Sequence, residues 1–337
     1  MVSKKCFKPS LFYFLMVFVF NLAFNELNAQ SVIHFKQPPT LKKGDTIAIV
    51  APAGFLKEKD AIDEGIELMK EWGLHVVLGK HVYDQHNHFA GTDKNRAKDM
   101  QWAMDDPKIK AIWCARGGYG TVRIMEYLDF SKFKQRPKWL IGYSDISVLH
   151  NALYTMGIES IHGFMATSTS SFKDSKAEKS MKKALFGKKI TYKVTSSTYN
   201  NMGVTSGRLI GGNLSLIASL LGTPYAINPE NSILFIEDIG EHLYRIDRMM
   251  MSLKLNGFFE NCKGIIIGGI TNVPENDPPF GLSLEELVRD VVDDPNMPIL
   301  FDFPSGHFAN NKSLPFGRLV QLEIDDKKGK LVIPKPQ

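Results

Sequence analysis

The sequence predicts an α/β fold with two domains, a parallel-sheet domain followed by a smaller mixed α/β domain. Two observations lead to this prediction. In the first half of the chain, apolar runs rich in β-branched residues alternate with helical patterns, and a polar stretch at 167–206 separates them from further strands and helices. The 337 residues also suffice for two cores, since a domain usually takes ~100–200 residues.

The first 29 residues have the pattern of a secretory signal peptide. Lys4, Lys5 and Lys8 precede an apolar run at 11–24, and small and polar residues follow it up to Ala29. The run is shorter than the ~20 residues that a membrane span needs. We therefore expect cleavage near Ala29, export to the periplasm or the medium, and no stable membrane anchor after processing.

The predicted first domain covers residues 40–166. It opens with a continuous β-branched run at 46–52 that is typical of a buried parallel strand. Further strands are expected at 74–78, 109–114 and 139–141, and helices at 59–72, 93–105, 122–127 and 146–156. Strands that alternate with helices predict a parallel sheet covered on both faces.

The predicted second domain covers residues 207–334. The stretch at 167–206 is rich in Ser, Thr, Lys and Asn without a long apolar run, and is interpreted as the interdomain connection. Strands are expected at 233–236, 264–270, 320–324 and 331–333, and helices at 243–255 and 284–292. This order predicts a mixed α/β domain.

Composition excludes some classes of function. The formal net charge is +5 and no stripe of arginine or lysine stands out, so nucleic-acid binding has no support. Cys114 and Cys262 lie far apart, beside or within apolar runs, and are expected to be buried free thiols rather than a disulfide.

Ser144 lies where an apolar strand turns within a few residues into a helix. In such a nucleophile elbow the serine hydroxyl is exposed, Gly142 allows close approach, and the backbone N–H of Asp145 faces a developing oxyanion. Ile146 stands where the second glycine of G-x-S-x-G would be. The alternative is that Ser144 or Asp145 merely caps the helix.

A glycine-rich loop, Arg116-Gly117-Gly118-Tyr119-Gly120-Thr121, follows the strand that ends at Cys114. Its backbone N–H groups could bind a phosphate or form the second half of an oxyanion hole, with Gly118 as the donor. The third glycine of the dinucleotide-binding fingerprint is missing. A plain tight turn is the alternative.

Two further positions could complete a catalytic triad. Glu237 ends an apolar strand, although Asp238 and Glu241 close by leave the choice of acid open and a solvated turn is the alternative. His307 lies in a glycine-containing loop and could act as a general base, or be incidental. Serine, acid and histidine follow one another in the order found in α/β-hydrolases.

No metal and no cofactor are expected. His81, His86 and His88 crowd one segment together with Asp84, but their spacing is not that of a zinc motif. A polar surface loop is the preferred interpretation of this segment.

Taken together, these fragments resemble the LD-carboxypeptidase family, the S66 serine peptidases that also include the microcin C immunity proteins. The matching segments are 44–48, 51–54, 90–92, 116–120, 142–146, 161–163, 211–214, 237–241, 244–248, 304–307 and 314–317. The resemblance thus covers nearly the whole chain after residue 43. One departure is Phe164, where the family pattern has proline, which is expected to alter the wall of the cleft.

The resemblance implies a role for each site residue. Ser144 matches the family's nucleophile, Glu237 its acid and His307 its base, and the backbone N–H groups of Gly118 and Asp145 would bind the oxyanion. Arg116 is a candidate clamp for the free carboxylate of the substrate, because a guanidinium matches two carboxylate oxygens.

The resemblance also implies fold and function. The first domain would resemble class I glutamine amidotransferases and carry the serine, the second would carry the Glu-His pair, and the site would lie between them. The substrate would be a murein tetrapeptide that loses its terminal D-alanine after the L-configured centre of a diamino acid. A homodimer is one assembly that the sequence leaves open.

Two other functions remain open at this point. The same hydrolase could cleave peptidyl-nucleotides or acyl-amino acid amides, as the immunity branch of the family does. From a different class, two α/β domains behind a signal peptide also describe a periplasmic ligand-binding module. The three triad residue types at the family positions argue against a role in binding alone.

Overall fold

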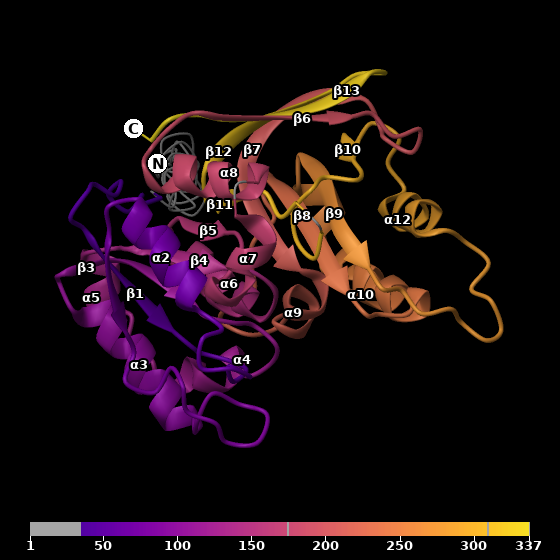
Figure 1. Cartoon of the computed structure of the whole chain (residues 1–337). Helices are drawn as coiled ribbons and strands as arrows, with labels where there is room; N and C mark the ends of the chain where they lie inside the picture. The colour runs from indigo at the N-terminus through magenta and orange to yellow at the C-terminus, as the bar shows by residue number, and fades with distance from the viewer. Residues whose placement is uncertain (1–34, 174, 309, 337) are drawn as a thin grey trace, which may run out of the picture. The chain divides into compact units, whose positions relative to one another are not determined.

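The computed structural model describes residues 35–173, 175–308 and 310–336 (Figure 1). The predicted signal peptide at 1–29 lies outside these residues. Within residues 35–336, apart from 174 and 309, no helix is both long and apolar enough to cross a membrane.

The first sheet has six strands in the order β11-β5-β4-β3-β1-β2, of which all but β11 run parallel. Its strands are β1 (Thr46–Val50), β2 (His75–Leu78), β3 (Ile109–Cys114), β4 (Trp139–Gly142), β5 (Ser160–His162) and β11 (Leu314–Phe316). The predicted strands of the first domain are therefore present, and β5 and β11 are additional.

Helices cover both faces of the first sheet, as the continuous apolar strands predict. Ile47 and Ile49 of β1 pack in one apolar cluster with α2 (Asp63–Glu71), whereas Ala48 and Val50 pack in another with α3 (Asp93–Asp105) and α6 (Ser147–Thr155). Figure 1 shows α2 and α3 on either side of β1. Because successive side chains of a strand point to opposite faces of the sheet, this one strand contributes side chains to two apolar cores.

The second sheet has seven strands in the order β10-β9-β8-β7-β12-β13-β6. Its strands are β6 (Ile190–Thr195), β7 (Gly203–Asn213), β8 (Ser232–Ile239), β9 (Gly264–Thr271), β10 (Ile299–Leu300), β12 (Leu319–Ile324) and β13 (Lys328–Ile333). From β7 to β10 the strands run parallel, and β12, β13 and β6 pair antiparallel. The prediction of a mixed α/β second half is confirmed, but its sheet is not the smaller one.

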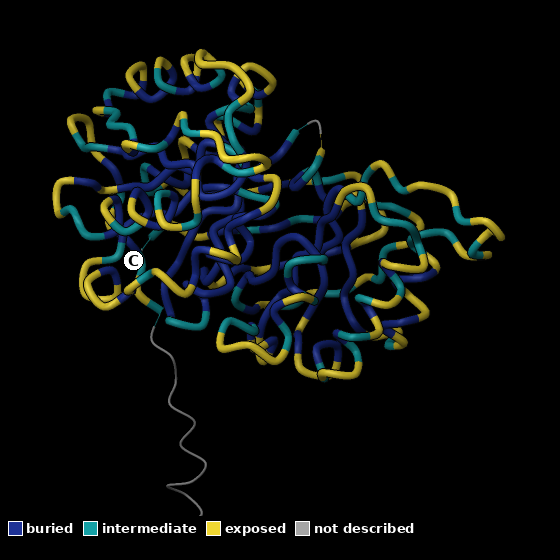
Figure 2. Tube along the Cα trace, turned by 90° about the horizontal axis from the view of Figure 1, so that it is seen from below, coloured by how far each residue is buried: buried dark blue, intermediate teal, exposed yellow. Residues whose placement is uncertain are grey.

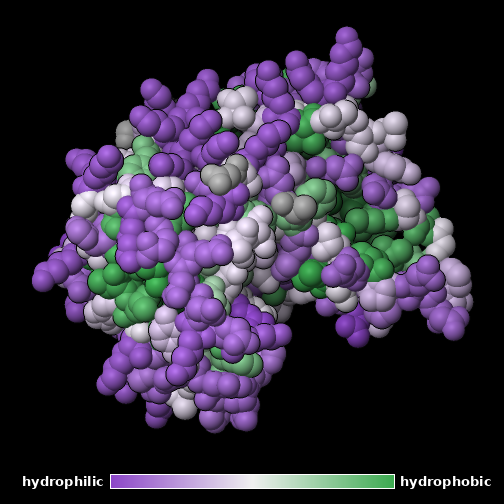
Figure 3. Space-filling model, in the orientation of Figure 1, coloured by the Kyte–Doolittle hydropathy of each residue, from purple (hydrophilic) through white to green (hydrophobic). Residues whose placement is uncertain are grey.

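Helices α9 (Leu214–Ser219), α10 (Leu243–Leu255) and α12 (Leu284–Val292) contribute buried side chains to the core of the second sheet. The N-terminus of α12 carries a complete capping box between Ser283 and Glu286. In Figure 2 the interior of the molecule is dark blue and buried, and the exposed residues lie mainly at its periphery. Figure 3 shows a mostly hydrophilic face on which hydrophobic side chains gather near β9 and α10.

The segment at 167–206, expected to connect two domains, belongs to the folded structure. It contains α7 (Thr169–Phe172), α8 (Lys176–Leu185) and β6, and β6 is the edge strand of the second sheet next to β13. Alternate residues of β6 are buried from Ile190 to Tyr192, which is sufficient for an edge strand although no long apolar run exists. This strand is the reason that the second sheet exceeds the first in size.

Cys114 and Cys262 are both buried free thiols, which confirms that prediction. Burial raises the pKa of both thiols, that of Cys262 to about 11. Both thiols are therefore protonated near neutral pH, and thiolate chemistry is not expected from either.

Candidate active site

Ser144 lies in a strained turn between β4 and α6. Its φ of 61° is in the left-handed region, which a residue other than glycine rarely adopts and which agrees with the strained turn expected of a nucleophile elbow. A Cβ atom at Gly142 would approach the Ile146 side chain to 2.8 Å, so the turn requires glycine there. No described side chain forms a hydrogen bond with the Ser144 hydroxyl. Such strain commonly marks a functional position.

The helix-capping alternative finds no support in the turn. The N-cap residues of the short 3₁₀ turn Ser144–Ile146 and of α6 are Tyr143 and Ile146, and neither makes a side-chain cap bond. The Asp145 carboxylate accepts a hydrogen bond from the backbone N–H of Thr121 at 2.8 Å instead. The pKa of Asp145 is raised, because the effect of burial exceeds the lowering by its hydrogen bonds to Thr121. Asp145 therefore ties the serine turn to the glycine loop.

The glycine loop packs directly against Ser144. A Cβ atom at Gly117 would lie 3.3 Å from Ser144 Cβ and 3.5 Å from its Oγ. From the other side, the buried Arg96 of α3 donates from Nη1 to the Gly120 carbonyl at 2.8 Å. Gly118, with a φ of 100°, is exposed between these fixed points. The loop is thus anchored beside the serine, as an oxyanion donor must be, and the role of Gly118 stays a prediction.

Glu237 and His307 form a short contact. Glu237 is fully buried near the end of β8, and its Oε2 lies 2.6 Å from His307 Nδ1 and accepts the His307 backbone N–H at 3.2 Å. Burial raises the pKa of Glu237, but the neighbouring imidazoles of His162 and His307 outweigh it and lower the pKa to about 2. Burial lowers the pKa of His307, but the Glu237 carboxylate more than offsets this and raises it. The pair has the arrangement of an acid that orients a base.

The other two acids of the cluster have different partners. The buried Asp238 carboxylate accepts hydrogen bonds from Asn213 Nδ2 at 2.9 Å and from the Ser215 hydroxyl at 2.8 Å. Glu241 pairs with Arg245 at 3.4 Å, four residues further along the chain. Of the three acids, only Glu237 contacts His307.

The serine turn and the histidine loop meet at Tyr143. The Tyr143 and His307 ring centroids are 5.0 Å apart. Close by, the Asn213 N–H donates to Ser147 Oγ at 3.0 Å, and a Cβ atom at Gly212 would approach this Oγ to 2.5 Å. The structure thus brings the predicted serine and the Glu-His pair to one region, without a direct hydrogen bond between Ser144 and His307.

Other predicted positions are less closely involved. The half-buried Arg116 donates from Nη1 to the Phe55 carbonyl at 2.7 Å, so its role as a substrate clamp stays a prediction. His81 Nδ1 lies 2.7 Å from Asp84 Oδ2. Phe164 is fully buried and packs on Trp113 with ring centroids 5.9 Å apart. Its expected effect on the wall of a cleft stays a prediction.

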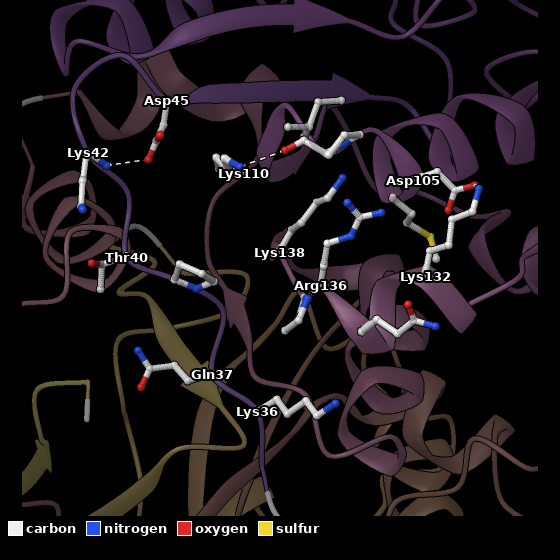
Figure 4. A pocket seen from close by; sticks show the side chains of 16 residues that line it. Lys36, Gln37, Thr40, Lys42, Asp45, Asp105, Lys110, Lys132, Arg136 and Lys138 are labelled. Carbon is white, nitrogen blue, oxygen red and sulfur yellow. Dashed lines mark hydrogen bonds and ion pairs between the residues drawn. The ribbon is translucent and has the colours of Figure 1, made fainter.

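A cavity of about 660 Å³ lies away from this site. Its lining includes Asp45, Ile109 and Lys138, which lie at the amino-terminal ends of β1, β3 and β4 (Figure 4). Ser144 and the glycine loop follow the carboxyl ends of β4 and β3. Ligands of open parallel sheets bind at the carboxyl ends, so this cavity is not the candidate active site.

Gly306 has a role that can be tested. Its φ is 91°, and a Cβ atom there would lie 2.5 Å from Glu237 Cβ. Gly306→Ala is expected to lower kcat at least about ten-fold by displacing the Glu237–His307 contact, and to lower Tm through backbone strain of about 1–3 kcal/mol. Gly281→Ala is the matched control, since Gly281 has a φ of 90° with nothing within 4 Å of the added Cβ. Equal kcat in both variants would contradict the steric role of Gly306.

Three comparisons with known proteins bear on this site. Residues 47–163 match the model of the LD-carboxypeptidase N-terminal domain, and residues 206–322 that of the C-terminal domain. The chain is 36% identical to the probable murein peptide carboxypeptidase of Bacillus subtilis strain 168 over 296 aligned residues. This alignment covers 86% of this chain and 92% of the relative.

Solved and curated relatives extend this similarity. The crystal structure of muramoyltetrapeptide carboxypeptidase from Oxalobacter formigenes has a TM-score of 0.79 at 29% identity, over 87% of this chain and 100% of that chain. The microcin C7 self-immunity protein MccF of Escherichia coli is 26% identical over 329 residues, or 85% of this chain and 93% of the relative.

Proposed function

Because this chain belongs to the LD-carboxypeptidase family, we propose that it is a serine carboxypeptidase that hydrolyses the L,D-peptide bond before the terminal D-alanine of murein tetrapeptides. The observation that carries the proposal is the short contact between Glu237 and His307 beside the strained Ser144 turn. The names of the Bacillus subtilis and Oxalobacter formigenes relatives support murein peptides as the substrate class.

In the proposed mechanism, Ser144 Oγ attacks the carbonyl carbon of the scissile bond while His307 Nε2 accepts its proton. His307 then donates this proton to the departing amine of D-alanine, and a water molecule hydrolyses the acyl-enzyme by the same steps. Glu237 orients the imidazole through Nδ1 and stabilises its cationic form. The His307 pKa, raised by Glu237, favours proton transfer from the serine.

Backbone groups and one arginine complete the proposed site. The N–H groups of Gly118 and Asp145 stabilise the oxyanion. The hydrogen bond from the Thr121 N–H to the Asp145 carboxylate holds the glycine loop beside the serine turn. Arg116 binds the free carboxylate of D-alanine. This carboxylate distinguishes a carboxypeptidase substrate from an internal peptide bond.

The proposal also covers where the protein acts and which fold its first sheet resembles. The signal pattern of residues 1–29 supports export, so the substrate is periplasmic or extracellular murein peptide in remodelling or recycling of the cell wall. The strand-turn-helix geometry at Ser144 supports a likeness of the first sheet to class I glutamine amidotransferases.

Mass spectrometry of reaction products tests the substrate. The purified protein is incubated with a tetrapeptide that ends in D-alanine after a diamino acid, and with a matched tetrapeptide that ends in L-alanine. Release of alanine from the first peptide alone is the expected result. No release from either peptide would contradict the proposed substrate.

The similarity to the microcin C7 self-immunity protein MccF supports a second candidate. In this alternative the same Ser144 hydrolyses peptidyl-nucleotides or acyl-amino acid amides. Cleavage of a peptidyl-adenylate analogue, together with inert tetrapeptides, would favour it over the murein reaction. Retention of a ligand without any turnover would instead indicate a periplasmic binding module.

A further inference from the structure

His162 is a buried histidine that the proposed mechanism does not use. It is the last residue of β5, at the carboxyl end of the first sheet, and is fully buried. Aromatic rings surround it: the ring centroids of Phe235, Phe316 and Tyr143 lie 5.1, 5.4 and 6.0 Å from its own. A polar ring in this setting needs hydrogen-bond partners, because burial without them is costly.

Two buried polar atoms face each other at this position. His162 Nε2 and Glu237 Oε1 are 4.0 Å apart, both side chains are fully buried, and neither atom has a hydrogen-bond partner among the described residues. The second oxygen of Glu237 is already used by His307. An ionised carboxylate oxygen buried without a donor is strongly unfavourable, so a shift of about 1 Å that closes this gap is favourable.

The surroundings determine which ring nitrogen of His162 carries the proton. Its Nδ1 lies 3.5 Å from Ser305 Oγ, whose hydroxyl donates to the Lys312 carbonyl at 2.7 Å. Ser305 could accept a proton from Nδ1, but at this distance the contact is too weak to decide the tautomer against a buried carboxylate. Because Glu237 is ionised, an unprotonated Nε2 would place a lone pair against a negative oxygen. The electrostatics therefore favour a proton on Nε2, directed at Glu237 Oε1.

The remaining titratable groups around this pair do not compete for the bond. The His150 ring is 6.2 Å away, and burial lowers its pKa to about 3, so it is neutral. Its two nitrogens are used by Ser160 Oγ and the Gly142 carbonyl. Burial raises the pKa of Tyr143, which stays protonated. Asp238, next to Glu237, is held by Asn213 and Ser215.

We infer that His162 is a positioning residue, which donates from Nε2 to Glu237 Oε1 and thereby holds the acid of the proposed triad between two histidines. One histidine ends a strand of the first sheet, and the other lies in a loop beside the second sheet. This inference rests on the proposed roles of Glu237 and His307. According to this inference, His162 at the end of β5 fixes the Glu237 carboxylate that contacts the proposed base, His307.

The arrangement has a consequence for His307. A donor on Oε1 draws negative charge away from Oε2, which limits how far Glu237 raises the His307 pKa. Loss of the donor makes Glu237 a stronger acceptor for His307 alone. The His307 titration then moves to higher pH, so less of the base is neutral near pH 7, and the orientation of the carboxylate is also less well fixed.

Three variants separate positioning from packing. His162→Phe keeps an aromatic ring but has no donor, His162→Gln carries its N–H groups near the position of Nε2, and His162→Asn is too short to reach Glu237. His162→Phe is expected to raise the His307 titration midpoint by about 0.5 pH unit or more, measured by NMR of isotope-labelled histidine. It should also lower kcat about 10-fold with little change in KM, the loss typical of one hydrogen bond to a charged group. His162→Gln should restore most of both quantities, and His162→Asn should not.

The NMR measurement needs no substrate, so it separates this inference from the proposed function. Wild-type protein that titrates as expected but leaves tetrapeptides intact would contradict the substrate and not the role of His162. Variants that lose Tm but share the wild-type His307 midpoint would show a packing role only and overturn the inference. If His162→Phe does not fold, nitrogen NMR of the wild-type protein decides, since a proton on Nδ1 alone would also overturn it.

Discussion

Replacing Ser144 by alanine is expected to abolish release of D-alanine while the protein remains folded. The substitution removes the atom that forms the acyl-enzyme in the proposed mechanism, so kcat should fall on the order of 10⁴-fold or more, leaving the contribution of binding and the oxyanion hole. Alanine keeps the Cβ of serine, and the φ of 61° is as strained with one as with the other. Tm should therefore stay close to the wild-type value.

Product analysis by mass spectrometry and calorimetric binding of the tetrapeptide measure these effects together. Ser131→Ala, at the exposed start of α5 (Ser131–Gln135), is the matched control and should keep wild-type activity. Binding of tetrapeptide by Ser144→Ala without turnover supports the nucleophile. A variant that still releases D-alanine at the wild-type rate would exclude Ser144 from this role.

Replacing Glu237 by glutamine is expected to have the second largest effect. The side chain keeps its size but loses its charge, and an amide can hold the imidazole in the wrong tautomer, a change that costs about 10⁴-fold in kcat in a comparable triad. Burial lowers the His307 pKa and Glu237 raises it, with Glu237 prevailing in the wild type. The variant should therefore have a lower His307 pKa.

The pH dependence of kcat/KM reports this shift, and its sign follows from the role of the base. Wild-type activity is lost as the pH falls through the His307 pKa, because protonated His307 cannot accept the serine proton. In Glu237→Gln this acid limb should move to lower pH. Glu230→Gln, exposed just before β8, is the control and should leave profile and rate unchanged. An unshifted limb in Glu237→Gln would contradict the contact between acid and base.

Much of the fold was predictable because several elements carry strong local signals. The predicted helices at 93–105, 243–255 and 284–292 agree with α3, α10 and α12 in both bounds, and the long apolar strands are in place. Strand β7 was missed although it has 11 residues, because glycine and polar residues interrupt its apolar positions. Two short strands were missed for a different physical reason. β5 and β11 have three residues each, and their paired residues lie 152 to 156 positions apart in the chain, so no local pattern predicts them.

The candidate site was predictable only in part from residue chemistry. Ser144 alone fits a helix cap as well as a nucleophile, and its φ of 61° together with the hydrogen bond between Asp145 and Thr121 argues against the cap, while its role as nucleophile stays a prediction. Family resemblance identified Glu237 among three acids, and the structure gives the physical difference between them. His162 lies in the matching segment 161–163, but the sequence indicates no role for it, because its relation to Glu237 depends on how the two sheets pack.

The position of β11 has a consequence for how the chain can be divided. This strand follows the His307 loop along the chain, yet it pairs with β5 in the first sheet. The two halves are therefore interlocked through their backbones and are not separate modules joined by a hinge. A fragment that stops before Leu314 would leave β5 with an open, apolar edge and is expected to aggregate. The topology of the chain itself thus links the segments that carry the proposed nucleophile, acid and base.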